Sequence, residues 1–135
     1  MTQVRLDATG INKLKALDDA LLLLQRINGL VEQYALALKR QQPASVYVQN
    51  VRRQLPTLAE NLRSHFGSIS DIAIAVNLAA SRGASEVMRL RVLREGVAQI
   101  RQAMDIAIIQ TKAKHAIEET DQGAAPAPAD NTASS

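Results

Sequence analysis

The sequence predicts an all-α protein: a bundle of four helices, with long first and last helices, followed by a disordered C-terminal tail. Three observations support this fold class. Apolar residues recur at steps of three or four along most of the chain, which is the period of a helix. Aromatic residues make up only 2% of the chain, so Leu, Ile, Val and Ala must fill the core, which suits close-packed helices. Turn signals interrupt the pattern at Pro43, Gly67 and Gly83.

The first helix is expected from about residue 10 to 41, after a flexible leader at residues 1–9. Asp7 or Thr9 can cap its N-terminus. Its apolar face changes direction by more than about 90° along the helix. The two apolar stripes are Ile11, Leu14, Leu17 and Leu21, and then Leu23, Ile27, Leu30, Tyr34 and Leu38.

The two stripes overlap at residues 21–24, a run of four leucines that makes the helix apolar nearly all round. One interpretation is a helix that passes between two packing partners inside a single bundle. The other is that one stripe is an intermolecular face, as in a homodimer. The candidates for such self-association are Leu22, Leu23 and Leu30.

The second helix is expected at residues 44–66. Its stripe keeps its phase across Pro56, which favours one kinked helix. The alternative is a break at Gln54 and Leu55, with Pro56 in the first turn of a new helix. The third helix is expected to begin at Ser68, with Asp71 in a capping-box-like position, and to end at residues 82–83. Its small apolar residues allow a neighbouring helix to approach closely.

The last helix is the longest, at residues 84–119, and Gly96 is its only interior glycine. An amphipathic helix of this length needs the other helices to cover its apolar side. We therefore expect the first and last helices to project beyond a common core. Residues 120–135 are small, polar or proline, so they predict an acidic, disordered tail. The domain boundaries follow: leader 1–9, helical bundle 10–119 and tail 120–135.

The net charge of +3 is unevenly distributed. Residues 40–115 hold eleven Lys and Arg against five Asp and Glu, whereas residues 116–135 hold four acids and no base. In projection, basic residues gather beside the apolar stripes of the last and second helices. This basic ridge comprises Arg91, Arg94, Arg101 and Lys112 on the last helix and Arg52 and Arg63 on the second. These side chains either pair with carboxylates within the chain or contact nucleic acid or an acidic protein partner.

No catalytic, cofactor or metal motif is present, and we expect a protein that is not an enzyme. His115 and Glu119 are the nearest approach to a metal-ligand pair, and a solvated helix end explains them better. The absence of cysteine fits a reducing compartment. The most apolar window, residues 69–80, is too short to span a bilayer, so we expect a cytoplasmic protein without a membrane span.

These features favour a non-catalytic helical interaction or scaffold (adaptor) protein that self-associates as a homodimer. The alternative is a nucleic-acid-binding accessory protein that uses the basic ridge.

Overall fold

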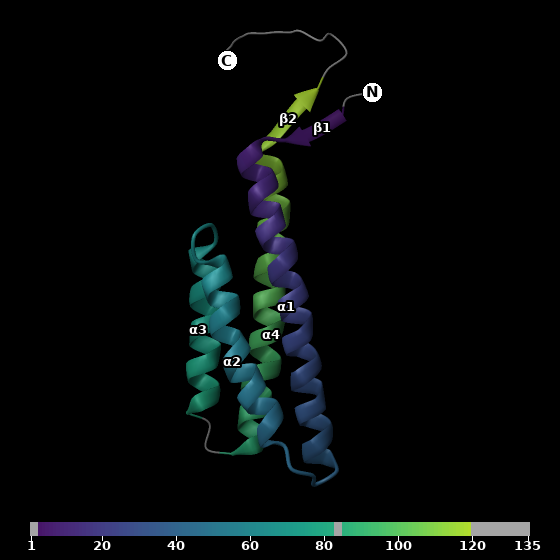
Figure 1. The fold of residues 1–135 in the computed structure, drawn as a ribbon, viewed down its shortest axis with the longest axis vertical. Helices are drawn as coiled ribbons and strands as arrows, with labels where there is room; N and C mark the ends of the chain where they lie inside the picture. The colour runs from purple at the N-terminus through teal and green to yellow at the C-terminus, as the bar shows by residue number, and fades with distance from the viewer. Residues whose placement is uncertain (1–2, 83–84, 120–135) are drawn as a thin grey trace.

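The computed structural model describes residues 3–82 and 85–119 and shows a four-helix bundle in which successive helices run in opposite directions (Figure 1). The helices are α1 (Ala8–Lys39), α2 (Ser45–Leu62), α3 (Gly67–Ser81) and α4 (Glu86–Lys114). Helices α1 and α3 each pack against both α2 and α4, so α2 and α4 lie at opposite corners. The predicted four-helix bundle is confirmed.

The core runs along the centre of the bundle and takes residues from all four helices. Aliphatic side chains fill most of it, and Tyr34 is the one aromatic residue among the fully buried side chains. Its largest members also include Leu17, Ile27, Leu55, Leu58, Leu93, Ile100 and Met104. Each buried side chain of this size stabilises the fold by about 1.5–3 kcal/mol relative to exposure.

Helices α1 and α4 project beyond the turn that joins α2 to α3 (Figure 1). There the N-terminal part of α1 lies beside α4 alone, whereas the rest of α1 lies between α2 and α4. This arrangement explains why the apolar face of α1 changes direction. Residues of both stripes, including Leu21 and Leu23, pack against the core of the same chain. The interpretation with two partners inside one bundle therefore accounts for both stripes.

Two segments differ from the expectation. Residues 3–6, expected within a flexible leader, form strand β1 (Gln3–Leu6), and the expected end of the last helix forms strand β2 (Ala116–Glu119). The two strands pair antiparallel, with Gln3 opposite Glu119 and Leu6 opposite Ala116. Helix α4 therefore ends at Lys114 rather than residue 119. The strands are too short to predict from sequence, because each satisfies its backbone only by pairing with the other.

The junction between the strands and the helices is held by His115. The Asp7 amide donates to the His115 carbonyl at 3.0 Å, and the Asp7 side chain caps α1 by accepting from the Gly10 amide at 2.7 Å. Nδ1 of His115 lies 3.2 Å from the Asp7 carboxylate, and Nε2 lies 3.3 Å from Nζ of Lys13. Because an ammonium group can only donate, Nε2 accepts from Lys13 and Nδ1 donates to Asp7. His115 is thus bound by Asp7 and Lys13.

Gly10 is required for this junction. A Cβ atom at Gly10 would lie 2.6 Å from the Cβ of His115 and 3.2 Å from the Cβ of Leu6. Only the absence of a side chain lets the two chain segments approach so closely.

Helix α1 begins two residues before the expected start and ends at Lys39. Its C-terminus is closed by Gln41, whose φ of 54° is left-handed. The Gln42 amide donates to the Ala37 carbonyl at 2.8 Å and the Gln41 amide donates to the Leu38 carbonyl at 3.1 Å. This is the Schellman arrangement, in which glycine is the usual residue at the left-handed position.

Helix α2 passes through Pro56 without a break, as the single-helix interpretation predicted. It ends at Leu62 rather than residue 66, and Gly67 opens α3 instead of ending α2. The expected capping box of Ser68 and Asp71 is wrong, because no side chain caps the N-terminus of α3. The Phe66 carbonyl instead accepts from the amides of Ile69 and Ser70 at 3.1 and 3.0 Å.

Helices α3 and α4 approach closely at Gly96. A Cβ atom there would lie 2.5 and 2.6 Å from the two methyl groups of Val76. Val76 and Ala73 are both buried on the α3 side. The expectation that the small residues of the third helix allow close approach agrees with this contact. The predicted acidic tail at residues 120–135 lies outside the described residues.

Candidate interaction surface

The three leucines expected to mediate self-association lie on two sides of α1, because Leu23 and Leu30 are seven residues apart and share one side, whereas Leu22 lies on another. Leu22 is 59% exposed. Leu23 and Leu30 are only partly exposed and pack against the core of their own chain. Of the three, only Leu22 is therefore available on the surface, and a substitution at Leu23 would also disturb the bundle.

Leu22 belongs to a line of exposed residues along the outer side of α1. Leu36 is 44% exposed, Ile11 is 56% exposed, and Gly29 has no atom within 4 Å of the position that its Cβ would take. At 100° per residue these four positions fall within about 40° of one another. We call Ile11, Leu22, Gly29 and Leu36 the outer line of α1. The sequence signal for it is the spacing of seven residues between Leu22, Gly29 and Leu36.

Charged residues lie on both sides of Gly29 along α1. Asp18 and Asp19 precede Gly29 by eleven and ten residues, and Lys39 and Arg40 follow it by ten and eleven. All four side chains are exposed. None of them has a hydrogen-bond or ion-pair partner among the residues that the structure describes. Two acids thus lie on the N-terminal side of Gly29, together with the exposed bases Lys15 and Arg26, and two bases lie at the matching distance on the C-terminal side.

The basic ridge is divided between two corners of the bundle. Arg52 lies on α2 and Arg63 is its C-cap, whereas the other four residues lie on α4 at the opposite corner: Arg91, Arg94, Arg101 and Lys112. Four of these six side chains have a carboxylate partner, and the pairs are Arg63–Glu60, Arg91–Glu95, Arg94–Glu32 and Arg101–Asp105. Within the described part of the chain, Arg52 and Lys112 have none.

Arg94 makes the best-defined of these pairs. Its Nη2 and Nε donate to the two carboxylate oxygens of Glu32 on α1, at 2.8 and 3.2 Å. The hydrogen bond to Arg94 holds the pKa of Glu32 below its usual value, and the same bond raises the pKa of Arg94. Both side chains are about half exposed, so solvent screens the pair and its contribution to stability is small.

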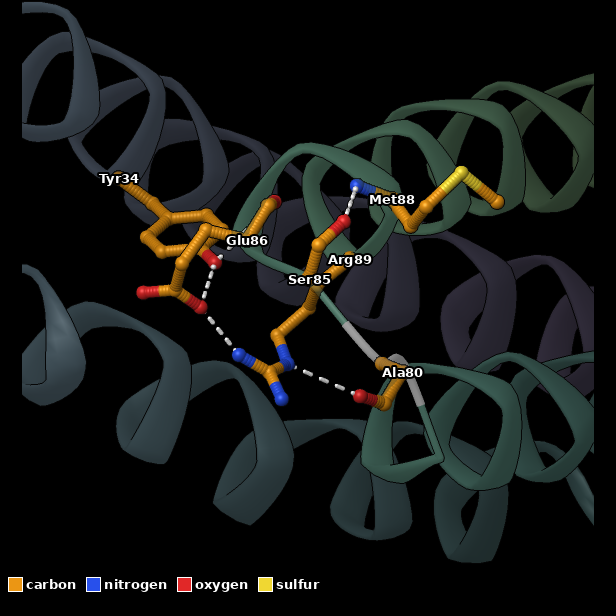
Figure 2. Close-up of polar contacts among 6 residues, drawn as sticks. All are labelled: Tyr34, Ala80, Ser85, Glu86, Met88 and Arg89. Atoms are coloured by element: carbon orange, nitrogen blue, oxygen red, sulfur yellow. Dashed lines mark hydrogen bonds and ion pairs between the residues drawn. The ribbon is translucent and has the colours of Figure 1, made fainter.

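A second polar cluster ties three helices together near the α3–α4 connection (Figure 2). The buried Tyr34 hydroxyl of α1 donates to Oε1 of Glu86 at 2.7 Å. Nη1 of Arg89 bonds the same carboxylate, and its Nε donates to the Ala80 carbonyl at the end of α3 at 3.0 Å. Ser85 caps α4 by accepting from the Met88 amide at 3.2 Å.

Burial, and then the neighbouring Glu86 carboxylate, raises the pKa of Tyr34 above its ordinary value. The Tyr34–Glu86–Arg89 cluster satisfies a buried hydroxyl and the Ala80 carbonyl in the last turn of α3, so it is a structural clasp. Sequence reasoning placed Tyr34 only in an apolar stripe. Its partner lies 52 residues away, and no local pattern reports such a contact.

Within residues 3–82 and 85–119, no three His, Asp or Glu side chains gather closely enough to hold a metal ion. None of the helices in these ranges has an apolar stretch that could cross a membrane. A scan against protein-family models and searches of curated proteins and of solved structures each found no significant match.

Proposed function

We propose that this protein is a non-catalytic interaction protein that binds a second copy of itself through the outer line of α1. The observation that carries the proposal is the exposure of Leu22 and Leu36 on either side of the exposed Gly29. Packing within the bundle does not explain why leucine occupies these two exposed positions. A glycine between them lets another helix approach closely.

The outer line is self-complementary when a second copy runs in the opposite direction. With the two-fold axis at Gly29, Leu22 of one copy meets Leu36 of the other. Asp18 and Asp19 then lie near Lys39 and Arg40 of the second copy, because the two charged pairs are equally far from Gly29. A parallel arrangement would instead place like charges together, which is unfavourable.

The same features favour a protein partner over nucleic acid. Most of the basic ridge is already paired with carboxylates, and its two parts lie at opposite corners of the bundle. A phosphate backbone would have to displace these partners, and it would meet Glu32 and Asp105 beside the arginines.

The first test replaces Leu22 with Glu and measures the molar mass by light scattering from about 1 to 300 μM. Because the proposed dimer is two-fold symmetric, the substitution removes two leucines from the interface and places two charges in an apolar contact. We therefore expect the dimer dissociation constant to rise about 30-fold or more. Leu78→Glu is the matched control, because Leu78 is 50% exposed but lies on α3. A wild-type protein that is monomeric over the whole range contradicts the proposal.

The second test uses the absence of cysteine in the chain. A Gly29→Cys variant places two thiols at the two-fold axis, so mild oxidation should give a disulfide-linked dimer within minutes to hours. Ala75→Cys, at an exposed position on α3, should remain largely monomeric under the same conditions. Equal cross-linking of the two variants would show that the thiols meet by random collision.

A further inference from the structure

A cavity of about 390 Å³ lies where the α2–α3 turn meets the projecting parts of α1 and α4. It exists because α2 and α3 stop short of the ends of the two longer helices (Figure 1). Its lining combines apolar side chains, among them Phe66 and Ile69, with polar groups. Its volume lies within the range of small-molecule sites.

The polar groups at this cavity are mostly basic. Lys13, Lys114, His65 and His115 line it, and no Asp or Glu does so. Asp7 contacts His115 but is not part of the lining. Lys114 has no partner among the described residues, and Lys13 uses only its contact with His115. Two ammonium groups thus retain free donors at one cavity, which favours an anionic group there.

Two further observations point to a ligand. Helix α3 begins at the cavity wall, where Ser68 lines the space and no side chain caps the helix, so its positive end is available. Thr111 also lines the cavity and is only 5% exposed. Its hydroxyl has no hydrogen-bond partner in the described part of the chain. The residue is buried, but the hydroxyl oxygen itself is not fully enclosed by protein, so a bound anion in the cavity would accept its hydrogen bond.

We propose that this cavity binds a small ligand that carries a phosphate or carboxylate group on a compact apolar body. Lys13 and Lys114 would hold the anionic group, Thr111 and Ser68 would donate hydrogen bonds to it, and Phe66 would contact the apolar part.

The cavity and the outer line of α1 can be tested separately. Lys13 and Leu22 are nine residues apart, so they point in directions about 180° apart on α1. Ligand binding can therefore be measured in the Leu22→Glu variant, and failure of one proposal does not entail failure of the other.

The experiment follows amide chemical shifts by NMR while phenyl phosphate, benzoate, inorganic phosphate or benzyl alcohol is added at constant ionic strength. We expect saturable shifts at the amides of Ser68, Thr111 and Lys114 with phenyl phosphate or benzoate at about millimolar concentration. The neutral alcohol should bind more weakly. Inorganic phosphate separates the contribution of the anionic group from that of the apolar body.

Two matched lysines on α4 provide the control. Lys114→Gln should weaken binding about tenfold, because it removes a charge-assisted contact. Lys112→Gln, two residues away and outside the lining, should change binding less than about twofold. An equal loss in the two variants, or the absence of saturable shifts, overturns the proposal.

Thr111→Val gives a second, independent measurement. Valine keeps the shape of threonine but removes the hydroxyl, which has no partner within the described part of the chain, so the fold should be retained. Phenyl phosphate and benzoate should nevertheless bind less tightly. Unchanged affinity in Thr111→Val would contradict the role of this hydroxyl at the site.

Discussion

Replacement of Gly96 by alanine tests the closest helix contact in the bundle. Two effects of opposite sign are expected. Alanine favours a helix interior over glycine by about 1 kcal/mol. The added Cβ, however, would lie 2.5 and 2.6 Å from the two methyl groups of Val76, so α3 and α4 must move apart or Val76 must change its rotamer. Overpacking of this kind costs about 1–3 kcal/mol.

We expect steric overlap to dominate, because the nearest atoms belong to a short branched side chain in a buried position. Gly96→Ala should lower the free energy of unfolding by about 1–2 kcal/mol, measured by urea denaturation. Gly29→Ala is the matched control, because Gly29 is also in a helix interior but a Cβ added there would meet no side chain and no other helix within 4 Å. It should raise the free energy of unfolding by about 1 kcal/mol, measured at concentrations where the protein is monomeric.

The double variant separates steric overlap from other causes. Val76→Ala alone leaves a small cavity and should cost about 2 kcal/mol. In the double variant, the methyl group added at position 96 enters the space that Val76 vacates. The double variant should therefore be about 1–3 kcal/mol more stable than additivity predicts. If Gly96→Ala stabilises as much as Gly29→Ala, the reasoning about this contact is refuted.

Other substitutions test the clasp and the ends of α1. Tyr34→Phe removes the hydrogen bond to the half-exposed Glu86 and should cost about 1 kcal/mol in urea denaturation. Gln41→Gly relieves a left-handed φ and should raise the thermal midpoint by stabilising the fold by about 1 kcal/mol; an unchanged midpoint would argue against that conformation. The hydrogen bond from the Gly10 amide, and then His115, lowers the pKa of Asp7 below the 3.8 of an unperturbed aspartate. The charge of Asp7 therefore stabilises the fold fully above its unfolded pKa, and this contribution is lost as pH falls through the folded pKa. The stability difference between wild type and Asp7→Asn should accordingly shrink between about pH 5 and pH 2, and a difference that is constant with pH would contradict this origin.

The helices were predictable because their signals are local. The apolar periodicity, the turn residues and the Asp7 cap each depend on residues only a few positions apart. The two apolar stripes of α1 likewise agree with its two packing partners, α2 and α4. Pro56 was tolerated inside α2 because the apolar stripe continues in phase on both sides of it. The capping box at Ser68 failed because α3 begins at Gly67 with Phe66 at the N-cap position, so Ser68 lies inside the first turn instead of capping it.

The strands and the polar contacts were not predictable, because their partners are distant in sequence. β1 and β2 each have four residues, which is too few for a reliable alternation pattern. Tyr34 and Glu86, or Lys13 and His115, meet only after four helices have been arranged. Sequence periodicity assigned the residues of the basic ridge to two helices, but sequence alone does not show that α2 and α4 occupy opposite corners.

The junction at His115 has a consequence for the order in which the chain folds. Asp7 and His115 are 108 residues apart, whereas the contacts between successive helices close much shorter loops. Closing the longest loop costs the most chain entropy. Here only the short β1–β2 pairing and a few polar contacts compensate for that cost. We therefore expect this junction to form after the bundle. We also expect it to open by local fluctuation while the bundle stays folded. Amide hydrogens at Arg5 and Asp7 should exchange with solvent much faster than those of Ile27 or Ile100, because the junction opens locally whereas the core of the bundle does not.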